Sequence, residues 1–215
     1  MKACPLPNGT TRYRRTLAFI LATLLLTLLA ACDKPPRIAP LPANAVVLAF
    51  GDSLTHGNGA PAGEAYPEIL AGLLGRTVIN AGVPGEVSSA GLARLPQLLD
   101  QYRPQLVILC HGGNDFLQRL DRTQTAANVA AMIEQSRAAG ADVILVGVPE
   151  PGLLLSPPKF YQETAERFGI PCEGKIVSDL LGDRNYKSDT IHPNAAGYRR
   201  MAEALYALIK KAHGI

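Results

Sequence analysis

The 215-residue sequence has only four cysteines and four histidines, and none of them has the spacing of zinc ligands. It also lacks a basic cluster beyond its N-terminus. Residues 1–31 hold four of the 21 Lys and Arg residues and no acidic residue. The other 17 basic residues stand against 18 acidic ones, a net charge of −1. The sequence therefore supports neither a zinc site nor nucleic-acid binding.

Nothing in the composition divides the rest of the chain. Hydrophobic residues make up 47% and charged residues 18%, a balance typical of a globular protein rather than of a disordered one. No internal repeat and no Pro- or Ser-rich boundary interrupts residues 45–213. The sequence therefore predicts one domain over residues 45–213, long enough to bury a sizeable core.

The N-terminus has no hydrophobic run of full membrane-spanning length. Basic residues up to Arg15 precede an uncharged stretch, Thr16–Ala31, that is shorter than the roughly 20 residues of a spanning helix. This order is typical of a secretory signal peptide. The segment Leu29–Cys32 (LAAC) resembles the bacterial lipobox, which implies removal of residues 1–31 and lipidation of Cys32. The alternatives are an uncleaved anchor and a plain signal whose cysteine is incidental.

The residues after the signal are expected to tether the domain to a membrane. Two or three acyl chains on Cys32 would hold the mature N-terminus in a bilayer, since one chain binds only marginally. Asp33 resembles the signal of enteric bacteria for retention in the inner membrane. Residues 32–44 are rich in proline and predict an extended tether. We expect a lipid-anchored protein of the bacterial cell envelope that faces the periplasm.

The predicted domain contains two cysteines, Cys110 and Cys172. Both lie in apolar segments, which favours two buried free thiols. A disulfide between them stays open, because exported proteins can form disulfides.

Short apolar runs alternate with helical patterns from residue 45 onward. The predicted strands are Ala45–Phe50, Thr77–Asn80, Leu106–Cys110, Asp142–Gly147 and a weaker one at Ile170–Glu173. The predicted helices are Tyr66–Leu74, Ser89–Leu99, Thr123–Ala139, Lys159–Phe168 and Ala195–Lys211. This alternation indicates an α/β fold with parallel strands and helices on both faces. Ligands of such sheets bind beyond the carboxyl ends of the strands.

The unusual residues of the sequence follow these strand ends. Ser53 lies in GDSL after the first strand, Gly82 in NAGVPG after the second, and Asn114 in GGND after the third. Asp189 and His192 lie in DTIHP before the last helix, where a carboxylate can fix the tautomer of an imidazole. Each fragment alone also fits an ordinary turn, but their joint occurrence in this order is far more specific.

These four segments together resemble the SGNH-hydrolase (GDSL esterase/lipase) family over residues 46–211. The text around Ser53, residues 85–95 and Asn114 is most similar to the branch of bacterial periplasmic arylesterases, thioesterases and lysophospholipases L1. The resemblance implies a three-layer, flavodoxin-like fold with a parallel sheet of about five strands. It also implies catalysis without a metal or another cofactor.

The resemblance further implies a role for each matched residue. Ser53 would be the nucleophile, His192 the general base and later acid, and Asp189 the group that orients His192. The oxyanion hole would consist of the Ser53 and Gly82 N–H groups and the Asn114 side chain. The chemistry agrees, because a serine hydroxyl needs a neighbouring base and a tetrahedral oxyanion needs fixed donors.

Other polar residues near these positions are not assigned to catalysis. His56 and His111 have no acidic residue placed as Asp189 is placed for His192. Asp52 and Asp115 are expected to accept hydrogen bonds that hold their loops.

The substrate is expected to be a small-molecule or lipid ester. Leu153, Leu154 and Leu155 follow the fourth strand in a Pro-flanked loop, and Phe116 and Leu117 follow Asn114. These residues are interpreted as the lining of an acyl-chain groove, with simple packing on the sheet as the alternative. No obligate protein partner is implied.

The leading interpretation is a serine esterase that cleaves carboxylic esters, thioesters or lysophospholipids in the cell envelope. One alternative is a carbohydrate O-acetylesterase acting on peptidoglycan or exopolysaccharide, although the sequence has no Trp to serve as a sugar platform. Another is a lipid-anchored binding module without catalysis, which the complete set of matched positions argues against.

Overall fold

The structure is a computed structural model that describes residues 36–152 and 155–213. The predicted signal peptide, Cys32 and Asp33 lie outside the described residues, as do Leu153 and Leu154. None of the helices in these two ranges is both long and apolar enough to cross a membrane.

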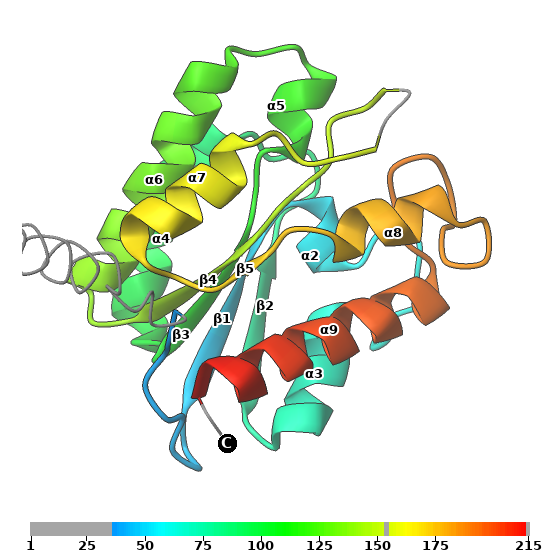
Figure 1. Ribbon diagram of the computed structural model, residues 1–215. Coiled ribbons are helices and arrows are strands. Elements are labelled where there is room, and N and C mark those ends of the chain that lie inside the picture. Colours follow the sequence, from blue (N-terminus) through cyan, green and yellow to red (C-terminus); the bar gives the residue numbers. More distant parts are fainter. Residues whose placement is uncertain (1–35, 153–154, 214–215) are drawn as a thin grey trace, which may run out of the picture. The chain divides into compact units, whose positions relative to one another are not determined.

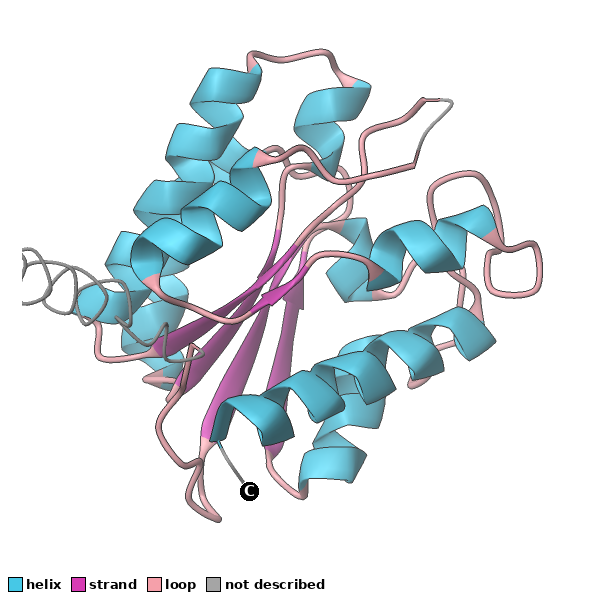
Figure 2. Ribbon diagram, viewed as in Figure 1, coloured by secondary structure: helices cyan, strands magenta, loops and turns pink. Residues whose placement is uncertain are grey.

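The centre of the domain is a parallel five-stranded sheet. Its strands are β1 (Val46–Gly51), β2 (Thr77–Gly82), β3 (Leu106–Cys110), β4 (Asp142–Val146) and β5 (Cys172–Glu173). They lie in the order β2-β1-β3-β4-β5, and all neighbouring pairs are parallel, so the arrows of Figure 2 run in one direction. The chain order reverses between β1 and β3, and this switch point is where open α/β sheets bind ligands. The predicted flavodoxin-like architecture is confirmed.

Helices cover both faces of the sheet (Figure 1). One side carries α3 (Tyr66–Leu74), α8 (Ile176–Gly182) and α9 (Ala195–His213), and the other carries α4 (Ser88–Tyr102), α6 (Arg122–Ala138) and α7 (Phe160–Phe168). Two short helices, α2 (Ser53–His56) and α5 (Gly113–Leu117), directly follow β1 and β3. The strands and long helices agree with the predicted ones to within a few residues, whereas α2, α5 and α8 were not predicted.

The core lies on both faces of β1, β3 and β4. All five residues of β3 are fully buried, as are most residues of the two neighbouring strands. Their sequences are therefore almost continuously apolar, as expected for strands that are covered on both faces. This core fixes the carboxyl ends of the strands, where the candidate site lies.

Part of the segment predicted as a tether packs on the domain. Ile38 is buried in the core, and the Ala39 N–H donates to Asp142 Oδ2 over 2.6 Å. The Leu41 carbonyl accepts from Arg76 Nη2 at 3.3 Å. Because these residues bury apolar surface and pair backbone groups, residues 38–41 belong to the domain rather than to a tether.

The two cysteines of the domain are free thiols. Cys110 is fully buried, which raises its pKa well above the ordinary value, and burial raises the pKa of Cys172 to about 11. Both are thus protonated and poorly nucleophilic at neutral pH.

Candidate active site

The residues singled out in the sequence meet at the carboxyl ends of β1, β2 and β3. Ser53 follows β1, Gly82 ends β2, Asn114 lies in α5 just after β3, and Asp189 and His192 lie in the loop before α9. Of the elements that carry these residues, the helices α2 and α5 are drawn in cyan in Figure 2, the strand β2 in magenta and the loop before α9 in pink. No cluster of three or more His, Cys, Asp or Glu within the described ranges could hold a metal ion.

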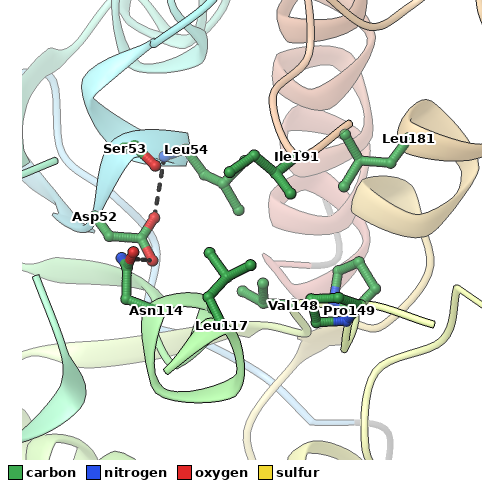
Figure 3. A pocket seen from close by; sticks show the side chains of 11 residues that line it. Asp52, Ser53, Leu54, Asn114, Leu117, Val148, Pro149, Leu181 and Ile191 are labelled. Atoms are coloured by element: carbon green, nitrogen blue, oxygen red, sulfur yellow. Dashed lines mark hydrogen bonds between the residues drawn. The ribbon is translucent and has the colours of Figure 1, made fainter. Parts of the chain in front are cut away.

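Ser53 is the first residue of α2, a helix of one turn. The carboxylate of Asp52, which caps this helix, accepts from the Leu54 N–H at 3.0 Å (Figure 3). The Ser53 carbonyl accepts from the N–H of Gly57, whose positive φ of 99° ends the helix. As the first amide of a helix, the Ser53 N–H has no intrahelical acceptor, so it is free to bind an anion.

His192 lies between Ser53 and Asp189. Its Nε2 atom is 3.0 Å from Ser53 Oγ, and its Nδ1 atom is 2.8 Å from Asp189 Oδ2. Since a carboxylate only accepts, Nδ1 carries the proton in the neutral imidazole, and Nε2 is left to accept the proton of the Ser53 hydroxyl.

The loop that holds Asp189 and His192 is braced by its own hydrogen bonds. Asp189 Oδ1 accepts from the backbone N–H groups of Ile191 and His192, both at 2.8 Å. Partial burial raises the pKa of Asp189, but the hydrogen bonds from the His192 ring and from these two amides outweigh it and lower the pKa below its ordinary value. Asn194 follows and caps α9, accepting from the Gly197 N–H at 3.0 Å. Asp189 is therefore ionised and fixed at neutral pH.

Two further donors lie beside Ser53. The Gly82 N–H donates to Asn80 Oδ1 at 3.1 Å. Position 82 has no room for a side chain, because a Cβ atom on the Gly82 Cα would lie 2.1 Å from the His56 backbone nitrogen. Asn114 Nδ2 donates to Asp52 Oδ2 at 3.2 Å (Figure 3). It also donates to the Glu86 carbonyl at 3.0 Å.

Asp52 and Asp115 hold the loops, as predicted. Asp52 is 2% exposed and connects α2 to Asn114; burial raises its pKa, although the nearby His111 opposes this. Asp115 is also 2% exposed and accepts from the N–H and the hydroxyl of Ser88 and from the Thr125 hydroxyl. The two carboxylates tie the strand-end helices to their neighbours.

A small pocket of about 40 Å³ opens beside Ser53. Figure 3 shows apolar side chains around it, with Ser53, Asp52 and Asn114 on one side. The apolar wall consists of Leu54, Leu117, Val148, Pro149, Pro151, Leu181 and Ile191.

The structure corrects the predicted acyl groove at Phe116 and Leu155, whereas Leu117 lines the pocket as expected. Phe116 is 6% exposed, and its ring lies edge-on to Phe160 and Tyr161 in the core. Successive residues of a helix point in directions about 100° apart, so it is Leu117 that faces the pocket. Leu155 packs against the core and is not part of the wall. Leu153 and Leu154 lie outside the described residues.

A second hollow, open and about 500 Å³ in volume, lies on the far side of His192. It is lined by residues 56–63 together with Asp189 and His192. His56 Nδ1 pairs with Asn58 Oδ1 at 2.9 Å rather than with an acid. The site is therefore flanked by an apolar pocket and by a more polar, open one.

Sequence reasoning missed a cluster behind the oxyanion donors. His111, which has no acidic neighbour in the sequence, lies 3.1 Å from Glu86 Oε2. Glu86 also pairs with Arg94 from α4. Glu86 and Arg94 lie within residues 85–95, which resemble the family branch, but no local signal in the sequence paired Glu86 with His111.

The chain is similar to several known proteins. The chain is 29% identical over 198 residues to the esterase TesA of Pseudomonas aeruginosa, covering 85% of this chain and 96% of that protein. It is 30% identical over 195 residues to thioesterase 1/protease 1/lysophospholipase L1 of Escherichia coli (strain K12), covering 87% and 88%. The solved structure of the psychrotrophic esterase EstA from Pseudoalteromonas sp. superposes with a TM-score of 0.69 at 25% identity, covering 78% and 98%.

The family model described as the GDSL-like lipase/acylhydrolase family matches residues 49–200, which include Ser53, Gly82, Asn114, Asp189 and His192. The resemblance inferred from the four sequence segments is thus confirmed. The chain belongs to the GDSL-like lipase/acylhydrolase family.

Proposed function

We propose that this protein is a serine esterase that hydrolyses carboxylic esters with short to medium acyl groups. The observation that carries the proposal is the chain of contacts from Asp189 through His192 to Ser53, with distances of 2.8 and 3.0 Å. Nucleophile, base and orienting acid have this spacing in serine hydrolases of unrelated folds.

In the first half-reaction, Ser53 Oγ attacks the ester carbonyl carbon while His192 Nε2 takes the hydroxyl proton. Asp189 keeps the proton on Nδ1 and stabilises the imidazolium that forms. The carbonyl oxygen becomes an oxyanion, and the Ser53 and Gly82 N–H groups and Asn114 Nδ2 are its donors. The oxyanion replaces Asn80 Oδ1 as the acceptor of the Gly82 N–H. It also replaces Asp52 Oδ2 as the acceptor of one Asn114 Nδ2 hydrogen, while the other hydrogen stays on the Glu86 carbonyl. Collapse breaks the ester C–O bond, and His192 returns its proton to the departing alkoxide.

In the second half-reaction, water takes the place of the alcohol. His192 accepts one proton from the water while the water oxygen attacks the carbonyl carbon of the acyl-enzyme. The same three donors bind the second oxyanion. Collapse releases the carboxylic acid and returns the proton from His192 to Ser53 Oγ.

The two hollows, one beside Ser53 and one beside His192, support an assignment of the two ends of the substrate. The apolar wall of Leu54, Leu117 and Ile191 favours the acyl chain, and the open hollow lined by residues 56–63 favours the leaving alcohol. Thioesters and lysophospholipids share this acyl chemistry and differ in the leaving group.

The test compares wild type with Ser53→Ala on p-nitrophenyl acetate, butyrate, hexanoate and palmitate, with circular dichroism as the control for folding. Wild type is expected to release p-nitrophenol and the variant to lose this activity while keeping its fold. An inactive wild type would favour a binding module, and activity confined to acetate would favour a carbohydrate O-acetylesterase.

We further propose that the protein is anchored in the cell envelope by lipid on Cys32. The proposal rests on the sequence Leu29–Cys32 at the end of a short signal. The variant Cys32→Ser is expected to leave the membrane fraction or to accumulate unprocessed. A variant that is cleaved and remains in membranes as wild type does would contradict lipid anchoring.

A further inference from the structure

Behind the oxyanion donors, the chain between β2 and α4 makes a tight turn. Pro84 and Gly85, which has a φ of 79°, occupy its central positions, and the Glu86 N–H donates to the Val83 carbonyl at 3.2 Å. This is the pattern of a type II turn. The turn presents the Glu86 carbonyl to Asn114 Nδ2, at 3.0 Å.

The Glu86 side chain is held from two sides. Arg94 donates through Nε to Oε1 at 2.8 Å and through Nη2 to Oε2 at 2.6 Å, a bidentate pair. His111 Nε2 donates to Oε2 at 3.1 Å. The side chain of Glu86 is only 7% exposed and that of His111 is fully buried, so water does not compete for these contacts.

The same three residues touch each segment that carries an oxyanion donor. Arg94 Nη2 also donates to the carbonyl of Ala81, the neighbour of Gly82, and its guanidinium lies 4.4 Å from the centre of the Phe50 ring in β1. His111 lies between β3 and Asn114.

The packing leaves His111 little freedom. Gly91 in α4 faces the imidazole, and a Cβ atom at Gly91 would lie 2.3 Å from His111 Nε2. The tilted Phe50 ring lies 5.7 Å from the imidazole on another side. The packing therefore holds the His111 ring against Glu86.

We propose that Glu86, Arg94 and His111 form a positioning cluster that sets the geometry of the oxyanion hole, with Glu86 as the residue that aligns the Asn114 amide. The inference rests on the proposed function. The cluster itself touches no reacting atom. Its effect is to hold the Asn114 amide and the Gly82 segment where the tetrahedral oxyanion forms, which lowers the barrier without tightening the binding of the ground state.

The experiment measures kcat, KM and the inhibition constant of an alkyl boronic acid, which forms an anionic tetrahedral adduct with an active-site serine. The variants are Glu86→Gln and Arg94→Lys, each close in size to the residue that it replaces. Ile133→Val is the control, because it trims a fully buried side chain of α6, a helix that carries none of the catalytic or cluster residues. Thermal unfolding is recorded for all four proteins.

A misplaced catalytic group typically costs about 100-fold, so kcat of Glu86→Gln is expected to fall by about tenfold to 100-fold with KM nearly unchanged. The boronate inhibition constant is expected to rise by a similar factor. For Arg94→Lys, kcat is expected to fall and the boronate inhibition constant to rise by smaller factors, since lysine cannot make the bidentate pair. Ile133→Val is expected to keep the kcat of wild type despite its lower unfolding temperature.

The proposal is overturned if Arg94→Lys and any folded Glu86→Gln keep the kcat of wild type. It is equally overturned if kcat falls in these variants while boronate binding is unchanged. A third contrary result is that Ile133→Val loses as much kcat as they do for the same loss of stability. Should Glu86→Gln not fold, Arg94→Lys decides alone. A wild type that hydrolyses no ester refutes the proposed function, and this inference falls with it.

Discussion

His192 Nε2 lies 3.0 Å from Ser53 Oγ, although 139 positions separate the two residues in the sequence. The sheet brings β1 to the centre, and the loop before α9 returns to the end of β1. Asp189, which orients the ring, has a side chain that is 52% exposed, whereas that of His192 is 14% exposed. The base is therefore sheltered, but its orienting acid is partly solvated.

This difference in exposure predicts that replacing His192 costs more activity than replacing Asp189. Replacement of a general base typically lowers the rate by a factor of about 10² to 10⁴, so kcat of His192→Ala is expected to drop by a factor in that range. The kcat of Asp189→Ala is expected to fall less, because the Asp189 side chain is 52% exposed and water can accept from the His192 Nδ1–H in its place. Steady-state hydrolysis of p-nitrophenyl butyrate measures both. A larger loss in Asp189→Ala than in His192→Ala would contradict the assigned roles.

Asn114→Ala tests the oxyanion hole. Loss of one such donor typically costs about 100- to 1000-fold in kcat, and KM is expected to change little. The variant also removes the hydrogen bond to the buried Asp52, so its unfolding temperature is measured alongside. An unchanged kcat in the folded variant would remove Asn114 from the oxyanion hole.

The apolar pocket predicts a dependence on acyl length. Each buried methylene stabilises the bound state by about 0.8 kcal/mol, so kcat/KM is expected to rise by up to about fourfold per carbon from acetate to butyrate. Because the enclosed volume is about 40 Å³, the rise is expected to weaken beyond butyrate.

Leu117→Ser tests which residue forms this pocket, and it is expected to flatten the rise with little effect on acetate. Leu120→Ser is its matched control, since Leu117 and Leu120 are 44% and 43% exposed but only Leu117 lines the pocket. A profile of wild type that falls from acetate onward would move the assignment to an O-acetylesterase.

Glu86 predicts a dependence of stability on pH. Burial raises the pKa of Glu86, but the hydrogen bonds from His111 and Arg94 and the charge of Arg94 outweigh it and lower the pKa from 4.5 to about 2. The unfolded state therefore binds more protons in this interval, and Glu86 contributes stability above pH 4.5 that is lost as the pH falls toward 2. The shift corresponds to about 3 kcal/mol at most.

The difference in unfolding free energy between wild type and Glu86→Gln, from urea titrations between pH 6 and pH 3, is expected to shrink as the pH falls. Comparison with the variant cancels the contributions of the other carboxylates. A difference that stays constant over this interval would contradict the lowered pKa of Glu86.

The fold was largely predictable because its signals are local. The buried strands read as apolar runs such as Leu106–Cys110, and Gly75 and Gly169 end α3 and α7 with left-handed conformations. The helices α2, α5 and α8 have only four, five and seven residues, too few for a periodic pattern. Two of these three carry Ser53 and Asn114.

The candidate site was predictable where the family segments specify it and not where packing does. Ser53, Asp189 and His192 lie within hydrogen-bonding distance as their sequence segments suggested. The choice between Phe116 and Leu117 depends on the direction of one turn of helix, which the sequence does not encode locally. The pairing of His111 with Glu86 joins residues 25 positions apart across two strand ends, so only the folded chain reveals it.

Labelling with a fluorophosphonate, followed by mass spectrometry of the peptides, tests the central claim most directly. Such a probe reacts with an activated serine and mimics the tetrahedral adduct. Wild type is expected to carry one label, on Ser53, while Ser53→Ala carries none and His192→Ala reacts far more slowly. Stoichiometric labelling at another residue, or none in folded wild type, would contradict the assignment of Ser53 as the nucleophile.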